Sequence, residues 1–363
     1  MTEREHYLGF TLVSGIGPKR FASLLTIFKT AKNIWEASEI ELKAAGLGPI
    51  STQKFINFKK EFDFGSYARK LEKAGVGFVA LCDKNYPKLL KALDDAPIVL
   101  FTRGDFSLVN FERTIGVVGT RKITNYGREV TNLFATDLAM NGFTIVLGLA
   151  MGVDAVAGWS AIAAGGKTVA VLGSGIDLCY PPVNKPLYDK IIKDGGVVVS
   201  EFPMGLEPNP GTFPSRNRII AGLSLGVLVT EGAEDSGSLI TANVALAINR
   251  PAFAIPGPIT SSLSKAPLKL IAKGGKLVTS AEDIQKELGI KNYELRMKKT
   301  DTKFHNLSKD ELKIVQLLEN EGLSFDEIVR NSKLDSSAVG SLLSMMEIKG
   351  ILRNCDGLFQ LAA

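Results

Sequence analysis

The chain has 363 residues, of which 45% are hydrophobic and 36 are glycine, and its net charge is +5. This composition excludes a disordered or fibrous protein and predicts one sizeable α/β core with one or two small modules. The two histidines are His6 and His305, so the central region lacks the most common general base and metal ligand. We predict no metal site and no cofactor, and the lack of histidines there disfavours catalysis, although carboxylate-based chemistry stays open.

The location of the protein is indicated by its amino-terminal residues and cysteines. The stretch MTEREHYLGF has charges where a signal peptide needs an apolar run, and the three cysteines, Cys82, Cys179 and Cys355, are widely spaced. We expect a reducing, cytoplasmic location. Residues 144–164 could pass for a membrane span, but Asp154 and three glycines interrupt them, so we predict a strand, a loop and a helix there.

Residues 1–70 are predicted to form short helices around two similar turns, in residues 12–25 and 44–55. In each turn a Gly-x-Gly-Pro step ends one helix, and the proline can begin the next. The pattern resembles a helix-hairpin-helix, whose backbone N–H groups hold a DNA phosphate. A plain helical turn is an equal alternative for GIGPKR, which contains Lys19 and Arg20, and is favoured for GLGPIS.

Residues 71–289 contain apolar runs separated by glycine-containing loops and helical spacings. Continuous Val/Ile runs predict strands buried on both faces, and hence a mostly parallel sheet covered by helices. We predict a Rossmann-like, doubly wound α/β domain. The seven expected strands lie in GFVALC, TIGVVGT, FTIVLGLA, KTVAVLGS, GVVVSEF, LGVLVTEG and PAFAIPG.

Unusual loops follow five of these strands. In open parallel sheets, ligands bind at the carboxyl ends of the strands, where these loops lie. Their glycines allow close backbone approach, and Ser236 and Ser238 precede a helix whose N–H groups are free. With Arg121, Arg216 and Arg218, these loops predict an anion-binding rim. The Gly-x-Gly-x-x-Gly pattern of a dinucleotide site is missing from the first strand-loop-helix. The five loops are residues 119–121, 148–154, 173–184, 200–205 and 230–238.

The carboxyl-terminal part differs in charge from the rest. Basic residues exceed acidic ones by four in residues 1–70 and by four in 71–305, whereas acidic residues exceed basic ones by three in 306–363. We predict a linker at 290–305, then a winged helix with a hairpin turning at Asp356-Gly357. Its third helix has Lys349 as its one basic residue, which favours a protein-contact or regulatory role over DNA binding.

The central motifs together resemble those of one family, the DNA-processing protein A (DprA/Smf) proteins of bacterial natural transformation. The order of the three modules is similar too, and FPSRNRIIAGLS with SGSLITA is the most specific combination. The other matching stretches are NYPKLL, DDAPIVLFTRGD, VVGTR, GLAMGVDAVA, TVAVLGSGIDLCYPPVN, SEFPMG and PAFAIPG.

The resemblance implies a non-catalytic protein that binds single-stranded DNA, forms a homodimer through the Rossmann-like domain and loads the RecA recombinase. Arg121 and Arg218 should bind phosphates, and Phe213 should stack a base or, alternatively, pack in the core. The remaining expected DNA-binding residues are Gly119, Thr120, Lys185, Arg216, Asn217, Ser236 and Ser238. Of these, Arg216 could instead pair with Glu201 or Glu231, and Asn217 should brace its loop. We expect Tyr126 and Tyr180 to be structural.

The chain departs from the family pattern at three places: Gly158 stands where members commonly have histidine, Ala266 and Leu268 stand at the usual glycine and asparagine positions, and Pro210 stands where some members have lysine. Two alternatives stay open. One is a nucleotide-processing enzyme similar to the lysine-decarboxylase-like phosphoribohydrolases, with Glu201 or Asp177 as acid or base. The other is a recombinase adaptor with weak DNA contact.

Overall fold

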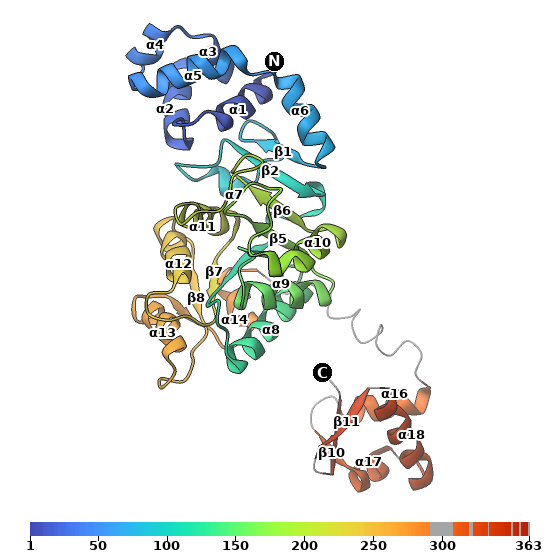
Figure 1. The fold of residues 1–363 in the computed structure, drawn as a ribbon. Coiled ribbons are helices and arrows are strands. Elements are labelled where there is room, and N and C mark those ends of the chain that lie inside the picture. Colours follow the sequence, from blue (N-terminus) through green and yellow to red (C-terminus); the bar gives the residue numbers. More distant parts are fainter. Residues whose placement is uncertain (291–307, 319–321, 333, 350, 356, 362–363) are drawn as a thin grey trace. The chain divides into compact units, whose positions relative to one another are not determined.

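The computed structural model describes residues 1–290 and 308–361, apart from 319–321, 333, 350 and 356. The chain forms two compact units, Met1–Asn292 and Tyr293–Ala363, which Figure 1 shows with their elements labelled. Apart from Ile290, the predicted linker lies outside the described residues. The predicted boundary after residue 70 falls within helix α6 (Phe64–Lys73). The finer division of the chain therefore stays a prediction.

The amino-terminal helices begin where the Gly-x-Gly-Pro steps predicted. Gly17 and Gly48 are the N-caps of α2 and α5, and Pro18 and Pro49 are their first residues. The aromatic rings of these helices belong to the same hydrophobic cluster as one face of the sheet, so the module is packed on the sheet domain. The helices are α1 (Glu3–Leu12), α2 (Pro18–Phe28), α3 (Ala31–Glu36), α4 (Glu39–Ala44), α5 (Pro49–Glu61) and α6.

A nine-stranded sheet forms the centre of the first unit, in the order β1-β2-β6-β5-β4-β3-β7-β8-β9. The seven strands from β6 to β9 are parallel, whereas β1 and β2 pair antiparallel. All seven predicted strands are confirmed; β2 and the short β9 were not predicted. The bounds are β1 (Gly77–Ala80), β2 (Val99–Gly104), β3 (Thr114–Val118), β4 (Thr144–Leu147), β5 (Thr168–Val171), β6 (Val197–Ser200), β7 (Val227–Val229), β8 (Ala252–Ala254) and β9 (Lys276–Leu277).

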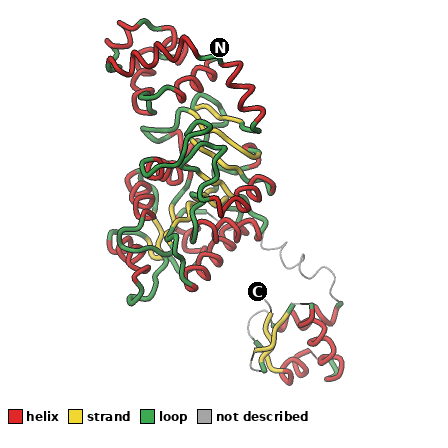
Figure 2. The backbone as a smooth tube through the Cα atoms, in the orientation of Figure 1, coloured by secondary structure: helices red, strands yellow, loops and turns green. Residues whose placement is uncertain are grey.

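Helices cover both faces of this sheet, as Figure 2 shows by secondary structure. Successive residues of a strand enter opposite layers, because side chains alternate: Val117 belongs to the hydrophobic cluster that includes residues of α8, α9, α10 and α14, and Val118 belongs to the cluster that includes residues of α7, α11, α12 and α13. The helices are α7 (Lys88–Lys91), α8 (Asn125–Met140), α9 (Val153–Ala163), α10 (Lys185–Lys193), α11 (Thr212–Leu223), α12 (Gly237–Ala247), α13 (Lys265–Ala272) and α14 (Ala281–Glu287).

The second unit is the predicted winged helix, with a core that includes Ile314, Ile328 and Val339. The expected hairpin joins β11 to β12; Asp356 lies outside the described residues. Lys349 pairs with Glu311 at 2.7 Å, so this cation is neutralised within its own module. The elements are α16 (Lys309–Leu317), β10 (Leu323–Ser324), α17 (Phe325–Ser332), α18 (Ser336–Ile348), β11 (Leu352–Cys355) and β12 (Leu358–Leu361).

Residues 144–164 form β4, a loop and α9, as predicted. Within the described ranges, no helix combines the length and the hydrophobicity that a bilayer crossing requires.

Candidate nucleic-acid interface

A cavity of about 420 Å³ lies at the carboxyl ends of the central strands. We call it the rim cavity. Its walls come from the loop after β3, the start of α11 and the start of α12, which the parallel topology brings to one edge of the sheet. Of the predicted site residues it brings together Gly119, Thr120, Arg121, Phe213, Arg216, Asn217, Ser236 and Ser238.

Helix α11 determines which of the clustered residues face the cavity. Phe213, Arg216 and Asn217 have the i, i+3, i+4 spacing of one helix face, and all three line the rim cavity. The expectation that Asn217 braces a loop is wrong, because this segment is helical. Arg218 is five positions after Phe213, which turns it roughly 140° away at about 100° per residue, and it lines a different cavity.

An aromatic and cationic pair lies at the rim cavity. The guanidinium carbon of the exposed Arg121 lies 5.6 Å from the centroid of the Phe213 ring. The ring of Tyr180 is 5.8 Å from that of Phe213, and 45% of Tyr180 is exposed. Tyr180 was expected to be structural, yet its ring extends this aromatic surface. Tyr126 does act structurally, since its hydroxyl donates to the Pro256 carbonyl.

Arg216 forms the floor of the rim cavity and is only 6% exposed. Its Nη1 donates to the Val171 carbonyl at 2.9 Å, while its Nε is buried and has no hydrogen-bond partner. Burial lowers the pKa of Arg216 to about 10, and the nearby Asp154 carboxylate opposes that shift. Burial also raises the pKa of Asp154. The floor is therefore a desolvated cation with unused donor capacity, which suits an anion.

The alternative that Arg216 pairs with Glu201 or Glu231 is wrong, because both carboxylates have other partners. Glu201 pairs with Arg218. Glu231 accepts from the backbone N–H and the hydroxyl of Thr124, at 3.0 and 2.6 Å, and thereby anchors the start of α8. The space for the Arg216 side chain comes from Gly148, where a Cβ atom would lie 1.7 Å from Nη1.

The backbone donors at the rim are partly used inside the fold. The Thr120 N–H donates to the Glu231 carbonyl at 2.8 Å, so it is not open to a ligand. The hydroxyl of Thr120 can still donate its hydrogen atom to a ligand. Ser236 caps α12 by accepting from the Ser238 N–H at 3.3 Å. The positive end of this eleven-residue helix lines the rim cavity, and it favours negative charge there.

Arg218 lines a second cavity of about 610 Å³, between the GIGPKR turn and the sheet domain. We call it the junction cavity. Arg218 pairs with Glu201 and, at 3.6 Å, with Asp95, while its Nη1 is buried without a partner. Burial raises the pKa of Glu201, and Arg218 opposes that rise. Lys19 and Arg20 line the same cavity, so the predicted helix-hairpin-helix turn faces the sheet domain.

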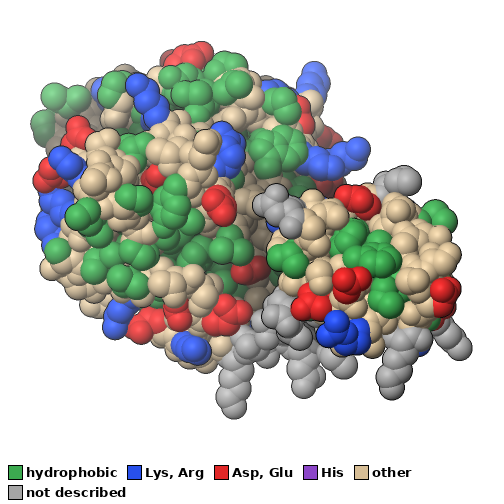
Figure 3. Space-filling model, turned by 90° about the horizontal axis from the view of Figure 1, so that it is seen from below, with side chains coloured by type: hydrophobic (Ala, Val, Ile, Leu, Met, Phe, Trp, Pro, Cys, Tyr) green, Lys and Arg blue, Asp and Glu red, His purple; other side chains and the backbone are tan. Residues whose placement is uncertain are grey.

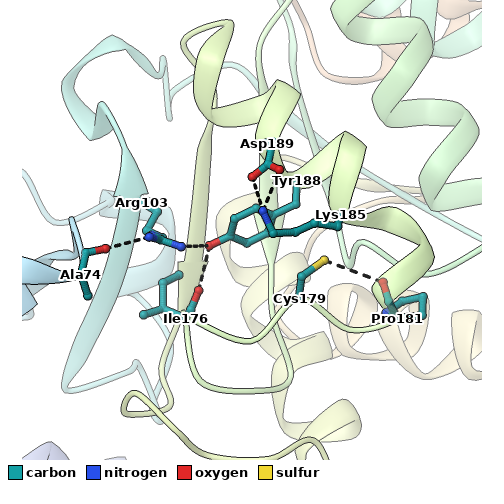
Figure 4. A network of polar contacts seen from close by, with 8 residues as sticks. All are labelled: Ala74, Arg103, Ile176, Cys179, Pro181, Lys185, Tyr188 and Asp189. Carbon is teal, nitrogen blue, oxygen red and sulfur yellow. Dashed lines mark hydrogen bonds and ion pairs between the residues drawn. The ribbon is translucent and has the colours of Figure 1, made fainter.

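Lys185 lies outside both cavities, on α10. Its Nζ is 2.5 and 2.7 Å from the two carboxylate oxygens of Asp189 and 5.2 Å from the ring centroid of Tyr188. Figure 4 shows that Tyr188 also accepts from Arg103, at 3.3 Å, and donates to the Ile176 carbonyl, at 2.8 Å. Lys185 is therefore a paired cation beside a structural network.

Comparisons with known proteins identify the family of this chain. The model of the family described as DNA recombination-mediator protein A matches residues 77–289, and the DprA winged helix domain matches residues 299–357. Protein Smf of Synechocystis sp. is 36% identical over 292 residues, which cover 79% of this chain and 73% of that protein. This chain belongs to the DNA-processing protein A (DprA/Smf) family. The Bacillus subtilis DNA processing protein DprA is 43% identical over 218 residues, covering 60% and 73% of the two chains.

Two solved structures of DNA-processing protein A resemble this one. The Streptococcus pneumoniae protein superimposes with a TM-score of 0.68 at 34% identity, covering 79% of this chain and 98% of that one. The Helicobacter pylori protein, described for its single-stranded DNA binding mode, gives a TM-score of 0.53 at 28% identity and covers 59% and 95%.

The departures from the DprA/Smf pattern are accommodated locally. Gly158 is buried in α9, where a Cβ atom would lie 3.1 Å from a methyl group of Leu187. Ala266 lies in α13, and its N–H donates to the Gly232 carbonyl at 2.9 Å. Pro210 lines the rim cavity without offering a charge.

On the face of the larger body drawn in Figure 3, basic and acidic side chains are interspersed.

Proposed function

We propose that this protein binds single-stranded DNA along the rim cavity and acts as a recombination mediator rather than as an enzyme. The observation that carries the proposal is the Arg121 and Phe213 pair, placed over the buried cation Arg216. A phosphate needs a cation and backbone or hydroxyl donors, and an unpaired base needs an aromatic face. The cavity offers both within one set of loops.

In this arrangement the residues have separate tasks. Arg121 is exposed and contacts a phosphate, with the hydroxyl of Thr120 and the start of α12 as further donors. Phe213 stacks a base, and Tyr180 extends the stacking surface. Arg216 adds a long-range attraction from below. A duplex keeps its bases stacked inside the helix and so cannot use Phe213, which gives a preference for single strands.

The comparisons support this reading. The relatives in Bacillus subtilis and Streptococcus pneumoniae are DNA processing proteins, and the Helicobacter pylori structure concerns single-stranded DNA binding. By the same resemblance we propose that the protein loads the RecA recombinase during natural transformation and forms a homodimer through its sheet domain. Cys82 and Cys179 are free thiols, which agrees with action in the cytoplasm.

The enzymatic alternative needs Glu201 or Asp177 as acid or base, and both carboxylates have partners within the fold. Glu201 is held in an ion pair with Arg218, and Asp177 accepts from the Gly205 N–H at 2.9 Å. Neither lines the rim cavity, so neither faces the proposed phosphate site.

Arg218 itself would contact DNA only if the strand reached the junction cavity.

A gel shift with labelled oligonucleotides, single-stranded against duplex, tests the proposal and separates it from both alternatives. We expect a shift with the single strand at protein concentrations that leave the duplex free. No shift with either DNA, together with retention of RecA on the immobilised protein, would favour the adaptor. Release of a base or phosphate from nucleotides would favour the enzyme.

A further inference from the structure

A groove between α8 and α9 lies next to the rim cavity, and the function proposed above uses only Arg121 of its lining. It has a volume of about 810 Å³, and we call it the α8/α9 groove. On its floor the Ser160 hydroxyl donates to the Asn132 side chain at 2.7 Å and ties the two helices together. Its other lining residues include Arg121, Lys122, Arg128, Glu129 and Trp159.

The groove combines an exposed aromatic ring with unpaired cations. Trp159, on α9, is 43% exposed, although tryptophan usually contributes a large buried surface. Arg121, Lys122 and Arg128 are all exposed, and none of them has an ion-pair partner among the described residues. With Glu129 as the one carboxylate of the lining, the groove has an excess of positive charge. Cations around an aromatic face are typical of surfaces that bind single-stranded nucleic acids.

The groove is continuous with the rim cavity, because Arg121 lines both. The connection is close: a Cβ atom at Gly152, next to the start of α9, would lie 2.8 Å from the carbonyl carbon of Arg121. Trp159 follows Gly152 by seven residues, so it lies about 10 Å further along the helix at 1.5 Å per residue. A polymer bound at Arg121 can therefore continue directly to Trp159.

We propose that a single DNA strand leaving the rim cavity past Arg121 continues along the α8/α9 groove. One base stacks on Trp159, and the adjoining phosphates contact Lys122 and Arg128. This inference rests on the proposed function and extends its binding site. A nucleic acid fits the groove better than a protein partner or a second copy, because three unpaired cations remain there without an acidic surface to neutralise them.

Intrinsic fluorescence of the full-length protein tests the stacking contact directly. The two tryptophans differ in environment: Trp35 is 9% exposed and packed among aromatic rings of the amino-terminal helices, whereas Trp159 is open. Titration with a long oligothymidine should quench the fluorescence, and Trp159→Phe should abolish the quenching while leaving the Trp35 emission. A short oligothymidine that fills the rim cavity alone should bind without quenching.

Affinity measured by fluorescence anisotropy provides the second readout. Trp159→Ala should weaken binding of the long oligothymidine about tenfold and leave that of the short one unchanged. Arg128→Gln should flatten the plot of log affinity against log salt by about 0.7. Leu133→Ala, an exposed apolar residue of α8 outside the groove lining, and Lys70→Gln, an exposed lysine of α6, are the matched controls and should change neither quantity.

The outcomes separate this inference from the proposed function. If the wild type binds the oligonucleotides but Trp159→Ala binds both lengths normally and quenching is absent, the α8/α9 groove does not hold DNA and the rim cavity stands. A change of oligomeric state in Trp159→Ala with normal DNA affinity would also overturn the inference and assign the groove to a contact between copies. If the wild type binds no single strand, both proposals fail.

Discussion

Replacing Arg216 by methionine should destabilise the first unit although the residue lies at the proposed binding site. The change removes the hydrogen bond to the Val171 carbonyl and the cation that acts on the buried Asp154. Loss of one partner of a buried charge pair costs about 3–5 kcal/mol, because the other charge stays behind uncompensated. Removing the unpartnered Nε offsets part of that cost, so we expect a loss of about 3 kcal/mol.

The second variant identifies the origin of this loss. In the Arg216→Met, Asp154→Asn double variant both charges of this buried pair are gone, and the asparagine oxygen can still accept from the Gly148 and Ala150 N–H groups, as Asp154 does at 2.8 and 3.2 Å. Replacing a buried pair by neutral groups is often close to neutral. We therefore expect the double variant to recover most of the lost free energy of unfolding.

The pH dependence of the single variant has a definite sign. Burial raises the pKa of Asp154 above its ordinary value of 3.8, and Arg216 opposes this rise. Without Arg216 the folded state binds the proton more tightly than the unfolded state, so the unfolding free energy falls as pH rises from 3.8 through the raised pKa. Urea unfolding, followed by the fluorescence of Trp35 and Trp159, measures both effects. Equal losses in the single and double variants, with no pH dependence, would refute the reasoning.

Three further predictions follow from individual contacts. Gly148→Ala should lower the melting temperature and reduce the free energy of unfolding by about 1–3 kcal/mol, because its Cβ atom would displace Arg216. An unchanged melting curve would mean that the Arg216 side chain does not lie against Gly148. Phe213→Ala should cost about 1–3 kcal/mol of single-strand affinity with an unchanged salt slope, measured by anisotropy, whereas lost stability with normal affinity would indicate a packing role. Lys349→Met should destabilise the winged helix by at most about 1 kcal/mol. Lys349 lowers the pKa of Glu311, so the stability difference between wild type and variant should be present above pH 4.5, the ordinary pKa of the carboxyl. It should vanish as the pH falls below the lowered pKa. A difference that calorimetry still detects in acid would contradict this prediction.

The sheet could be predicted from the sequence because its parallel strands are buried on both faces and therefore read as uninterrupted apolar runs. Strand β2 escaped that criterion, since Thr102 and Arg103 interrupt its apolar run. It also pairs antiparallel with both neighbours, outside the strand-loop-helix pattern that identified the others.

The site was predicted in its residue types more completely than in its geometry. Loops after parallel strands converge by topology, so grouping Gly119 to Arg121 with Ser236 and Ser238 required no coordinates. Helical spacing within FPSRNR separates Arg218 from Phe213, but the expectation that Asn217 braces a loop assigns no helix to this stretch. Pairing between distant charges, such as Glu201 with Arg218, depends on tertiary packing and has no local sequence pattern.

Oligonucleotide binding by the wild type and Arg121→Ala across a salt series tests the central claim most directly. Arg121 is exposed and forms no ion pair within the described ranges, so its removal should leave the fold intact, as thermal melts would verify. We predict weaker binding to every single-stranded sequence and a plot of log affinity against log salt that is flatter by about 0.7 for the lost phosphate contact. Unchanged affinity and slope in Arg121→Ala would contradict the assignment of the rim cavity to a DNA strand.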